Sequence, residues 1–331
     1  MKKTDFSPKT MGEVAEILRG SKKTLVLCHA RPDGDAIGSA LALVLMLRAL
    51  GGEAVAASAD EAPQYLRFLL DGVQDSLSFE NIPSGFEDAL VVAVDTASPA
   101  QLGALAEPFL SRVALMIDHH GTGEPFADYF VAPRAAATGE VLVSLAAKLG
   151  VSLTPAIATL LYAAISADTG CFRYSNVTEH THLAAAKLVG VGIDAAELNR
   201  LLFEVKSLET LRAEKAGFDR LSLYEEGTVG ILTFPRRLSL ELGLLDEHLS
   251  TLIDVARAVR GVEIAAAVRG TDKENTFRAS LRANVDFNVA AVAAVFGGGG
   301  HRRAAGVTLT ASSIEEAAEM LLSEIKKQRK K

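Results

Sequence analysis

The first half of the chain alternates short apolar runs with longer stretches of helical pattern. Continuous apolar runs are typical of strands that are buried on both faces. Such runs occupy residues 24–30, 89–97 and 112–120. A fourth strand is expected within residues 51–58, which begin with a two-glycine turn. Helical patterns occupy residues 36–50, 139–150 and 155–170. Apolar strands that alternate with helices predict an α/β fold with a mainly parallel sheet flanked by helices.

From about residue 190 the pattern changes. Residues 191–224 are predicted to be a helical connector that leads into a second, smaller α/β unit. In that unit we expect strands at 228–234, 261–270, 276–285 and 307–310, helices at 288–296 and 313–327, and a loop at 297–306. The predicted domains are therefore 1–190, 191–224 and 225–331.

Composition narrows the class of protein. The chain has 331 residues, 49% of them hydrophobic, which is enough for two packed domains. Its two cysteines, Cys28 and Cys171, exclude a disulfide framework and fit a reducing, cytoplasmic location. We find no signal peptide and no apolar run long enough to span a bilayer, so we expect no membrane partner. The net charge of −7 disfavours binding to long duplex nucleic acid, which usually requires a basic surface.

Carboxylate and imidazole side chains gather where the predicted strands and one helix end. These residues are His29, Asp33, Asp35, Asp95, Asp118, His119, His120 and Asp168. Because ligands of parallel sheets bind beyond the carboxyl ends of the strands, we expect these side chains to meet at one edge. A single Asp there can be a helix cap or a turn former, and for Asp35 alone both interpretations stay open. Taken together, the carboxylates would repel one another unless they are protonated or hold a cation.

Divalent metal ions would resolve this repulsion. An oxygen-rich site with a few imidazoles and no thiolate suits Mn²⁺, with Mg²⁺ or Co²⁺ as alternatives, better than structural Zn²⁺. Five or more candidate ligands are more than a single tetrahedral ion, with its four ligands, can use. They suggest two ions about 3.5–4 Å apart, the arrangement used for phosphoryl hydrolysis.

Five motifs occur in a fixed order: "HARPDGDAIGS", "VAVDTA", "IDHH", "ISADTG" and "GGGGHRRAAG". The first four resemble the motifs of the DHH phosphoesterase superfamily, and the fifth resembles the signature of its DHHA1 domain. The resemblance runs from about Thr24 to Leu309. A chain of this length is similar to the oligoribonuclease and pAp-phosphatase type, where pAp is 3′-phosphoadenosine 5′-phosphate. The resemblance implies a DHH domain joined by a helical connector to a smaller DHHA1 domain, with the active site in the cleft between them.

The resemblance also implies a role for each residue. The first metal ion would be held by His29, Asp33 and Asp95, and the second by Asp35, Asp95, His119 and Asp168, with Asp95 bridging. His120 would face the substrate phosphate, and Asp118 would lie behind the histidines as their orienting partner. The substrate would be bound by Arg282, Gly298, Gly299, Gly300 and His301. Glycines without a Cβ let backbone amides approach an anion closely.

The expected function is metal-dependent hydrolysis of short RNA oligonucleotides, of pAp, or of both, by a metal-activated water. Three alternatives stay open: a phosphodiesterase for pApA or cyclic di-AMP-type dinucleotides, a single-strand DNA exonuclease, and a non-catalytic nucleotide sensor. The length and acidic charge disfavour the exonuclease, and the intact motifs disfavour the sensor. The expected partners are short oligonucleotides or small nucleotides, and a homodimer is left open.

Overall fold

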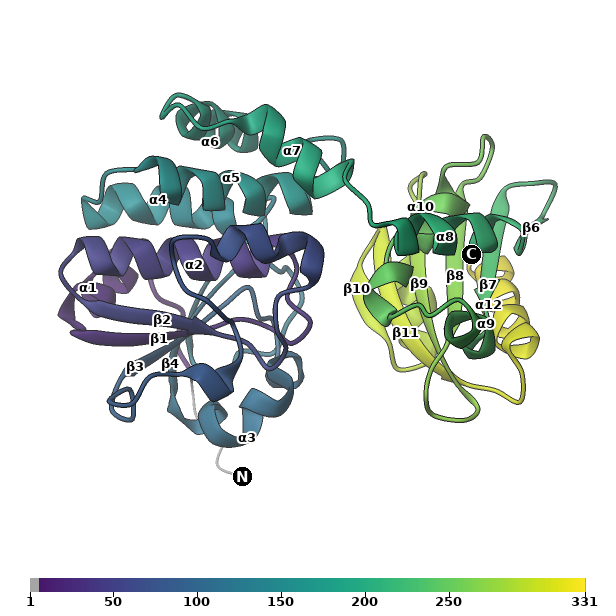
Figure 1. Ribbon diagram of the computed structural model, residues 1–331, viewed down its shortest axis with the longest axis horizontal. Coiled ribbons are helices and arrows are strands. Elements are labelled where there is room, and N and C mark those ends of the chain that lie inside the picture. Colours follow the sequence, from purple (N-terminus) through teal and green to yellow (C-terminus); the bar gives the residue numbers. More distant parts are fainter. Residues whose placement is uncertain (1–5, 331) are drawn as a thin grey trace. The chain divides into compact units, whose positions relative to one another are not determined.

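The computed structural model describes residues 6–330 and divides the chain into two units (Figure 1). The N-terminal unit ends at Val205 and the C-terminal unit begins at Lys206. Among the described residues, no helix combines the length and the apolar character that a membrane-spanning segment needs.

The N-terminal unit is built on a parallel five-stranded sheet. Its strands are β1 (Lys23–Leu27), β2 (Glu53–Ala57), β3 (Leu90–Val94), β4 (Val113–Asp118) and β5 (Asp128–Val131). They are ordered β2-β1-β3-β4-β5, and every neighbouring pair is parallel. This confirms the predicted parallel sheet. The edge strand β5 was not predicted, because its four residues contain an apolar run of only three, Tyr129–Val131, which is too short to indicate a buried strand.

Helices cover both faces of this sheet. The α-helices are α1 (Met11–Gly20), α2 (Gly34–Ala49), α3 (Ala106–Phe109), α4 (Thr138–Leu149), α5 (Pro155–Asp168), α6 (Glu179–Val189) and α7 (Ala195–Phe203). The 3₁₀ turns are η1 (Gln64–Leu70), η2 (Phe79–Asn81), η3 (Pro99–Leu105) and η4 (Leu110–Arg112). Figure 1 shows α1 and α2 as a layer on one face of the sheet, α4 and α5 as a second layer, and α3 on the opposite face.

Close helix packing positions the ends of three helices. A Cβ added to Gly38 of α2 would lie 2.5 Å from the Leu160 carbonyl oxygen of α5, and one added to Gly139 of α4 would lie 2.6 Å from the Ala164 Cβ. Near the start of α2, a Cβ on Gly34 would lie 2.5 Å from the Ala167 Cβ. The small residues therefore let the amino-terminal ends of α2 and α4 approach α5 closely.

The C-terminal unit holds a six-stranded sheet in the order β10-β11-β9-β8-β7-β6. The strands are β6 (Leu221–Tyr224), β7 (Val229–Phe234), β8 (Ile264–Gly270), β9 (Thr276–Ala283), β10 (Gly299–His301) and β11 (Ala304–Thr310). The helices are α8 (Leu208–Phe218), α9 (Arg236–Glu241), α10 (Leu252–Arg257), α11 (Val289–Val295) and α12 (Ile314–Arg329), with the 3₁₀ turn η5 (Asp246–Leu249). The pair β7–β8 is parallel, and the other pairs are antiparallel.

Two parts of this unit differ from the predictions. The predicted loop 297–306 contains β10, which pairs with β11, and β11 begins at Ala304 rather than at residue 307. A run of glycines carries no strand propensity, so the pairing comes from tertiary contacts and not from the local sequence. The last four residues of the predicted helical connector, Leu221–Tyr224, form strand β6.

The glycine contact between α2 and α5 predicts a stability effect. Gly38→Ala should destabilise the N-terminal unit by about 1–3 kcal/mol, because the added methyl group would press on the backbone of α5. Gly20→Ala is the control, since a Cβ at Gly20 meets nothing within 4 Å. Chemical denaturation of both variants measures the difference. Equal stability of Gly38→Ala and the wild type would show that the helices can move apart without cost.

Candidate metal centre

The turn between β1 and α2 places the first three candidate ligands. Asp33 is the N-cap of α2, and its Oδ1 accepts hydrogen bonds from the backbone N–H groups of Asp35 (3.1 Å) and Ala36 (3.0 Å). The capping role that the sequence left open for Asp35 therefore belongs to Asp33. His29 lies two residues after the end of β1.

Asp35 is fully buried and reaches across to the start of α4. Its Oδ2 accepts a hydrogen bond from the Thr138 N–H (2.6 Å), and its Oδ1 accepts from the Gly139 N–H (2.9 Å) and the Ser39 hydroxyl (2.8 Å). The N-terminus of a helix stabilises a negative charge. Even so, burial and the nearby charge of Asp95 raise the pKa of Asp35 well above its usual value.

Asp95 follows β3 in a strained conformation. Its φ is +50°, in the left-handed region that non-glycine residues rarely adopt, and its side chain is only 3% exposed. The Asp95 N–H donates to the Ile117 carbonyl (3.0 Å), and the Thr138 hydroxyl donates to Asp95 Oδ1 (3.0 Å). Strain of this kind persists only where the surroundings hold it in place, and it is common at functional sites.

Hydrogen bonds to carbonyl groups determine which imidazole nitrogen faces the carboxylates. His29 Nδ1 lies 2.8 Å from the Ala30 carbonyl oxygen, and His119 Nδ1 lies 3.2 Å from that of Ala135. A carbonyl can only accept, so in both rings the Nδ1–H donates and Nε2 is the atom that faces the carboxylates. A carbonyl partner of this type is the usual support for a metal-bound histidine.

The Nε2 atoms and the carboxylate oxygens form a compact cluster. His29 Nε2 lies 3.6 Å from an Asp95 oxygen and 3.7 Å from an Asp33 oxygen. His119 Nε2 lies 3.2 Å from Asp168, 3.7 Å from Asp95 and 3.8 Å from Asp35. Two ligands bonded at about 2.1 Å to one ion would lie roughly 3.0–3.4 Å apart. The cluster is close to that spacing.

Three overlapping donor groups could each hold an ion. They are His29–Asp33–Asp95, Asp35–His119–Asp168 and Asp95–His119–His120. The donor atoms are carboxylate oxygens and imidazole nitrogens, with no thiolate, which fits a hard divalent cation. Asp95 and His119 each belong to two of the groups, so neighbouring ions could share a ligand.

The pKa values describe the same crowding of negative charge. Burial raises the pKa of Asp168. Burial works against protonation of His29 and His119, but the surrounding carboxylates outweigh it and raise the pKa of His29 well above its usual value and that of His119 to about 11. Protons on these groups balance the carboxylates, and a bound cation would take over that role.

His120 has a different environment from His119. Its Nδ1 donates to Asp118 Oδ1 over 2.7 Å, and its side chain is 20% exposed, against 6% for His119. Burial tends to raise the pKa of Asp118, but the hydrogen bond and charge of His120, together with the charge and the backbone N–H of His119, outweigh it and lower that pKa. Asp118 also accepts from the backbone N–H of His119 (2.8 Å), whose ring is held by Ala135 instead. Asp118 therefore orients the ring of His120 alone.

The substrate residues predicted in the second unit lie on neighbouring strands. His301 of β10, Ala304 of β11 and Arg282 of β9 are directly opposite one another, so their side chains share a face. Gly300 has a φ of +138°, and a Cβ on Gly298 would lie 2.4 Å from the Gly306 carbonyl oxygen. Both positions therefore require glycine for reasons internal to the fold.

Sequence reasoning missed Thr138, which contacts two candidate ligands. Its backbone N–H donates to Asp35 and its hydroxyl donates to Asp95. The only local signal is the "TG" pair at the start of a helical pattern, which also suits an ordinary helix start.

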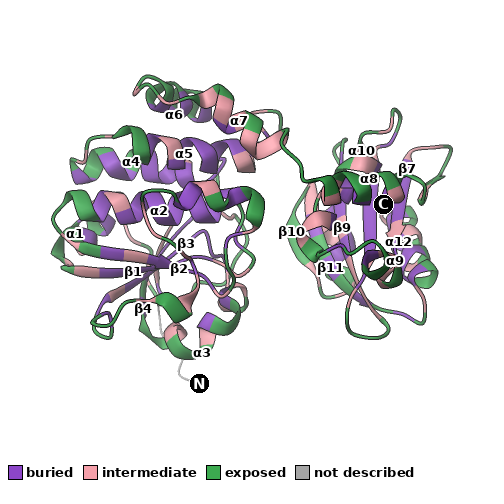
Figure 2. Ribbon diagram, viewed as in Figure 1, coloured by how far each residue is buried: buried purple, intermediate pink, exposed green. Residues whose placement is uncertain are grey.

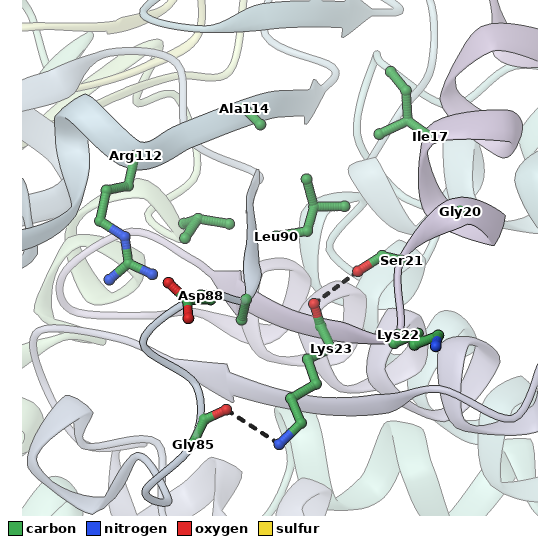
Figure 3. A pocket seen from close by; sticks show the side chains of 12 residues that line it. Ile17, Gly20, Ser21, Lys22, Lys23, Gly85, Asp88, Leu90, Arg112 and Ala114 are labelled. Atoms are coloured by element: carbon green, nitrogen blue, oxygen red, sulfur yellow. Dashed lines mark hydrogen bonds between the residues drawn. The ribbon is translucent and has the colours of Figure 1, made fainter.

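A cavity of about 670 Å³ lies elsewhere in the N-terminal unit, at the opposite ends of the strands (Figure 3). Its lining includes Lys23 at the start of β1, Leu90 at the start of β3, and Arg112 just before β4. Asp88 is the one carboxylate in that lining, so the cavity cannot match the donor cluster as a metal centre.

Comparison with known protein families finds a match in each of the two units, and comparison with known proteins finds a relative that spans both. The model of the DHH family N-terminal domain matches residues 23–165, and the model of the DHHA1 domain matches residues 238–327. A bifunctional oligoribonuclease and PAP phosphatase, NrnA, of Thermus thermophilus is 33% identical over 319 residues, which are 95% of this chain and 93% of that protein.

Two solved structures share the fold. An exopolyphosphatase-related protein from Bacteroides fragilis superimposes with a TM-score of 0.86 at 21% identity, covering 96% of this chain and 95% of that one. RecJ from Thermus thermophilus, in complex with Mn²⁺, has a TM-score of 0.56 at 15% identity, covering 96% of this chain and 55% of that one.

Because His119 and His120 contact different groups, we expect their alanine substitutions to lower different quantities, the metal content in one case and the rate in the other. His119→Ala should lower the Mn²⁺ content of the purified protein, because its Nε2 faces three carboxylates. His120→Ala should keep the metal content and lose about 10²- to 10⁴-fold in rate, as expected for a group that assists proton transfer. Elemental analysis and initial rates of both variants decide this. Equal metal loss in the two would show that His120 is a ligand.

Proposed function

This chain belongs to the DHH family, with a DHHA1 domain in its second unit, and we propose that it is a metal-dependent phosphoesterase that hydrolyses short RNA oligonucleotides and pAp. The observation that carries this proposal is the cluster of carboxylates and imidazoles at the carboxyl ends of β1, β3 and β4. The 33% identity to an oligoribonuclease and PAP phosphatase, over nearly the whole length of both chains, supports the substrate class.

The proposed metal ligands are His29, Asp33, Asp35, Asp95, His119 and Asp168. Two divalent ions fit the donor groups, with Mn²⁺ the best match to this mixture of oxygen and imidazole donors. Such a pair, when bound, lowers the pKa of a water molecule and stabilises negative charge on the phosphoryl oxygens.

Other residues of the chain hold the proposed ligands and the proposed catalytic histidine in position. Thr138 and Ser39 donate hydrogen bonds that hold Asp35 and Asp95 in place. Asp118 holds Nδ1 of His120, so that the other ring nitrogen can donate to a phosphate oxygen or move a proton. His120 is therefore the proposed catalytic partner, and Asp118 its positioning residue.

The second unit is the proposed source of substrate affinity. Arg282 and His301 lie on one row of the sheet, and a guanidinium can bind a phosphate through two parallel hydrogen bonds. Beside them, Gly299 and Gly300 are exposed on β10 and Gly298 directly precedes that strand, so the backbone of this segment is proposed to approach the ligand. We propose that these residues bind the terminal phosphate or base of the substrate. The net charge of −7 fits a small anion held locally better than a long polyanion.

A panel of substrates tests the proposed function. With Mn²⁺, the wild type should hydrolyse a dinucleotide, a pentanucleotide and pAp faster than a 24-mer or cyclic di-AMP, and excess EDTA should abolish all activity. Initial rates on labelled substrates measure this. Equal rates on the dinucleotide and the 24-mer would favour an exonuclease, and preference for cyclic di-AMP would favour a cyclic dinucleotide phosphodiesterase.

Removing Arg282 should weaken catalysis on natural substrates. A charge-assisted hydrogen bond contributes roughly 1.5–3 kcal/mol, so Arg282→Ala should lower kcat/KM for the dinucleotide about 10- to 100-fold. Arg237→Ala is the matched control, because Arg237 lies on α9 and pairs with Glu241. If both variants keep wild-type kcat/KM, Arg282 does not bind the substrate.

A further inference from the structure

Helix α5 ends at Asp168 and is followed by a strained loop, residues 169–177. The helix is buried over most of its length, with α2, α4, α6 and α7 packed around it (Figure 2). In the loop, Gly170, Cys171 and Phe172 have φ angles of +55°, +60° and +59°. Consecutive residues in this left-handed region are unfavourable unless they are glycine, so contacts must hold the loop in place.

Asn176 closes this loop onto the end of α5. Its side-chain Nδ2 donates one hydrogen bond to the Asp168 carbonyl oxygen (3.1 Å) and a second to the Ala136 carbonyl oxygen (3.0 Å). Because both neighbours are acceptors, the amide nitrogen and not the amide oxygen must face them. Asn176 Oδ1 is buried and has no hydrogen-bond partner within residues 6–330. The side chain therefore serves this place through its two N–H donors, although burial of the unpaired oxygen is unfavourable.

The N–H group of Ala136 is held by a second side chain. Glu140 Oε2 accepts from this N–H (3.1 Å) and from the hydroxyl of Thr181 (2.8 Å), which is fully buried in the first turn of α6. Both backbone polar groups of Ala136 are thus bound by side chains, its N–H by Glu140 and its carbonyl by Asn176. Helix α4, helix α6 and the loop after α5 therefore meet at this one residue.

Residues 135–139, which we call the holding segment, also bind two of the proposed metal ligands. The Ala135 carbonyl oxygen accepts from His119 Nδ1 at 3.2 Å. The first two backbone N–H groups of α4 donate to the carboxylate of Asp35, at 2.6 and 2.9 Å. The position of the holding segment therefore determines where both of these side chains lie.

Asn176 ties a third proposed ligand, Asp168, to the holding segment. Asp35, His119 and Asp168 together form one of the donor groups described above, so every member of that group is held through the same short segment. In the donor group around His29, the hydrogen bonds of the segment reach one member only, among the described residues. The two ion sites are therefore supported to different extents.

We propose that Asn176 is a positioning residue for the ion site formed by Asp35, His119 and Asp168. This inference rests on the proposed function, because it concerns the metal centre of that proposal. The Asn176 amide couples the end of α5, and with it Asp168, to the segment that holds the other two ligands. Without this link the strained loop can relax, and the Asp168 carboxylate loses its fixed distance from the other donors.

Asn176→Ala should weaken one of the two Mn²⁺ sites. The dissociation constant of that site should rise about 10- to 100-fold, as expected when a residue that supports a metal ligand is removed. The site at His29, Asp33 and Asp95 should keep its affinity. Isothermal titration calorimetry of the metal-free protein with Mn²⁺ measures both constants. Activity lost at limiting Mn²⁺ should return at high Mn²⁺, because the variant retains every ligand.

Asn199→Ala is the matched control. Asn199 also makes two hydrogen bonds to α5: its Oδ1 accepts from the Ser166 hydroxyl (2.6 Å), and its Nδ2 donates to the Tyr162 hydroxyl (3.1 Å). Within the part of the chain that the structure describes, it bonds to neither a proposed ligand nor the holding segment. Asn199→Ala should therefore lower the melting temperature of the metal-free protein and leave both dissociation constants unchanged.

A second pair of variants tests the holding segment if Asn176→Ala does not fold. Glu140→Ala removes the acceptor of the Ala136 N–H and the Thr181 hydroxyl, so it should weaken the same Mn²⁺ site. Glu140→Gln keeps a side-chain oxygen that can accept both bonds, so it should bind Mn²⁺ more tightly than Glu140→Ala. Equal affinities of these two variants would contradict the role of the segment.

The outcomes separate this inference from the proposed function. A wild type that binds no Mn²⁺ contradicts the metal centre and with it the proposed function. A wild type that binds two ions, with affinities unchanged in Asn176→Ala, overturns only the positioning role. If the affinities are unchanged but the rate falls and high Mn²⁺ does not restore it, Asn176 contacts the substrate instead. Equal weakening of both sites would show a general loss of structure and would also overturn the inference.

Discussion

The N-terminal unit depends on one electrostatic constraint, which is the crowding of four carboxylates at the end of a parallel sheet. Asp33, Asp35, Asp95 and Asp168 come from separate positions in the chain, and His29 and His119 face them with Nε2. Without a cation, the cluster must hold protons, as the raised pKa values of Asp35 and His119 show. The fold brings these groups together nonetheless, which is expected where the arrangement serves catalysis rather than stability.

Packing elsewhere in the unit holds this cluster in place. Glycines in α2 and α4 allow both helices to contact α5 closely, and the starts of α2 and α4 then meet through the hydrogen bonds of Asp35. Asp95 keeps a left-handed backbone conformation because a strand neighbour and Thr138 both hold it.

Much of this arrangement could be predicted from the sequence, for identifiable reasons. Apolar strands followed directly by His29, Asp95 and His119 indicate a parallel sheet with a polar edge, and that edge is what the structure shows. The contact between Asp35 and Thr138 could not be predicted, because it joins residues 103 positions apart through helix packing. The strand β10 was missed because its glycines have no strand propensity, and only the pairing with β11 reveals it.

The most direct test of this account is the metal stoichiometry and magnetic state of the protein loaded with Mn²⁺. Because one oxygen of Asp95 lies 3.6 Å from His29 Nε2 and the other lies 3.7 Å from His119 Nε2, the account predicts two ions per chain that share this carboxylate. Such a pair gives an electron paramagnetic resonance spectrum of coupled ions, and elemental analysis should find two manganese atoms per chain. A single ion per chain, or two ions with the spectrum of isolated Mn²⁺, would contradict the shared centre.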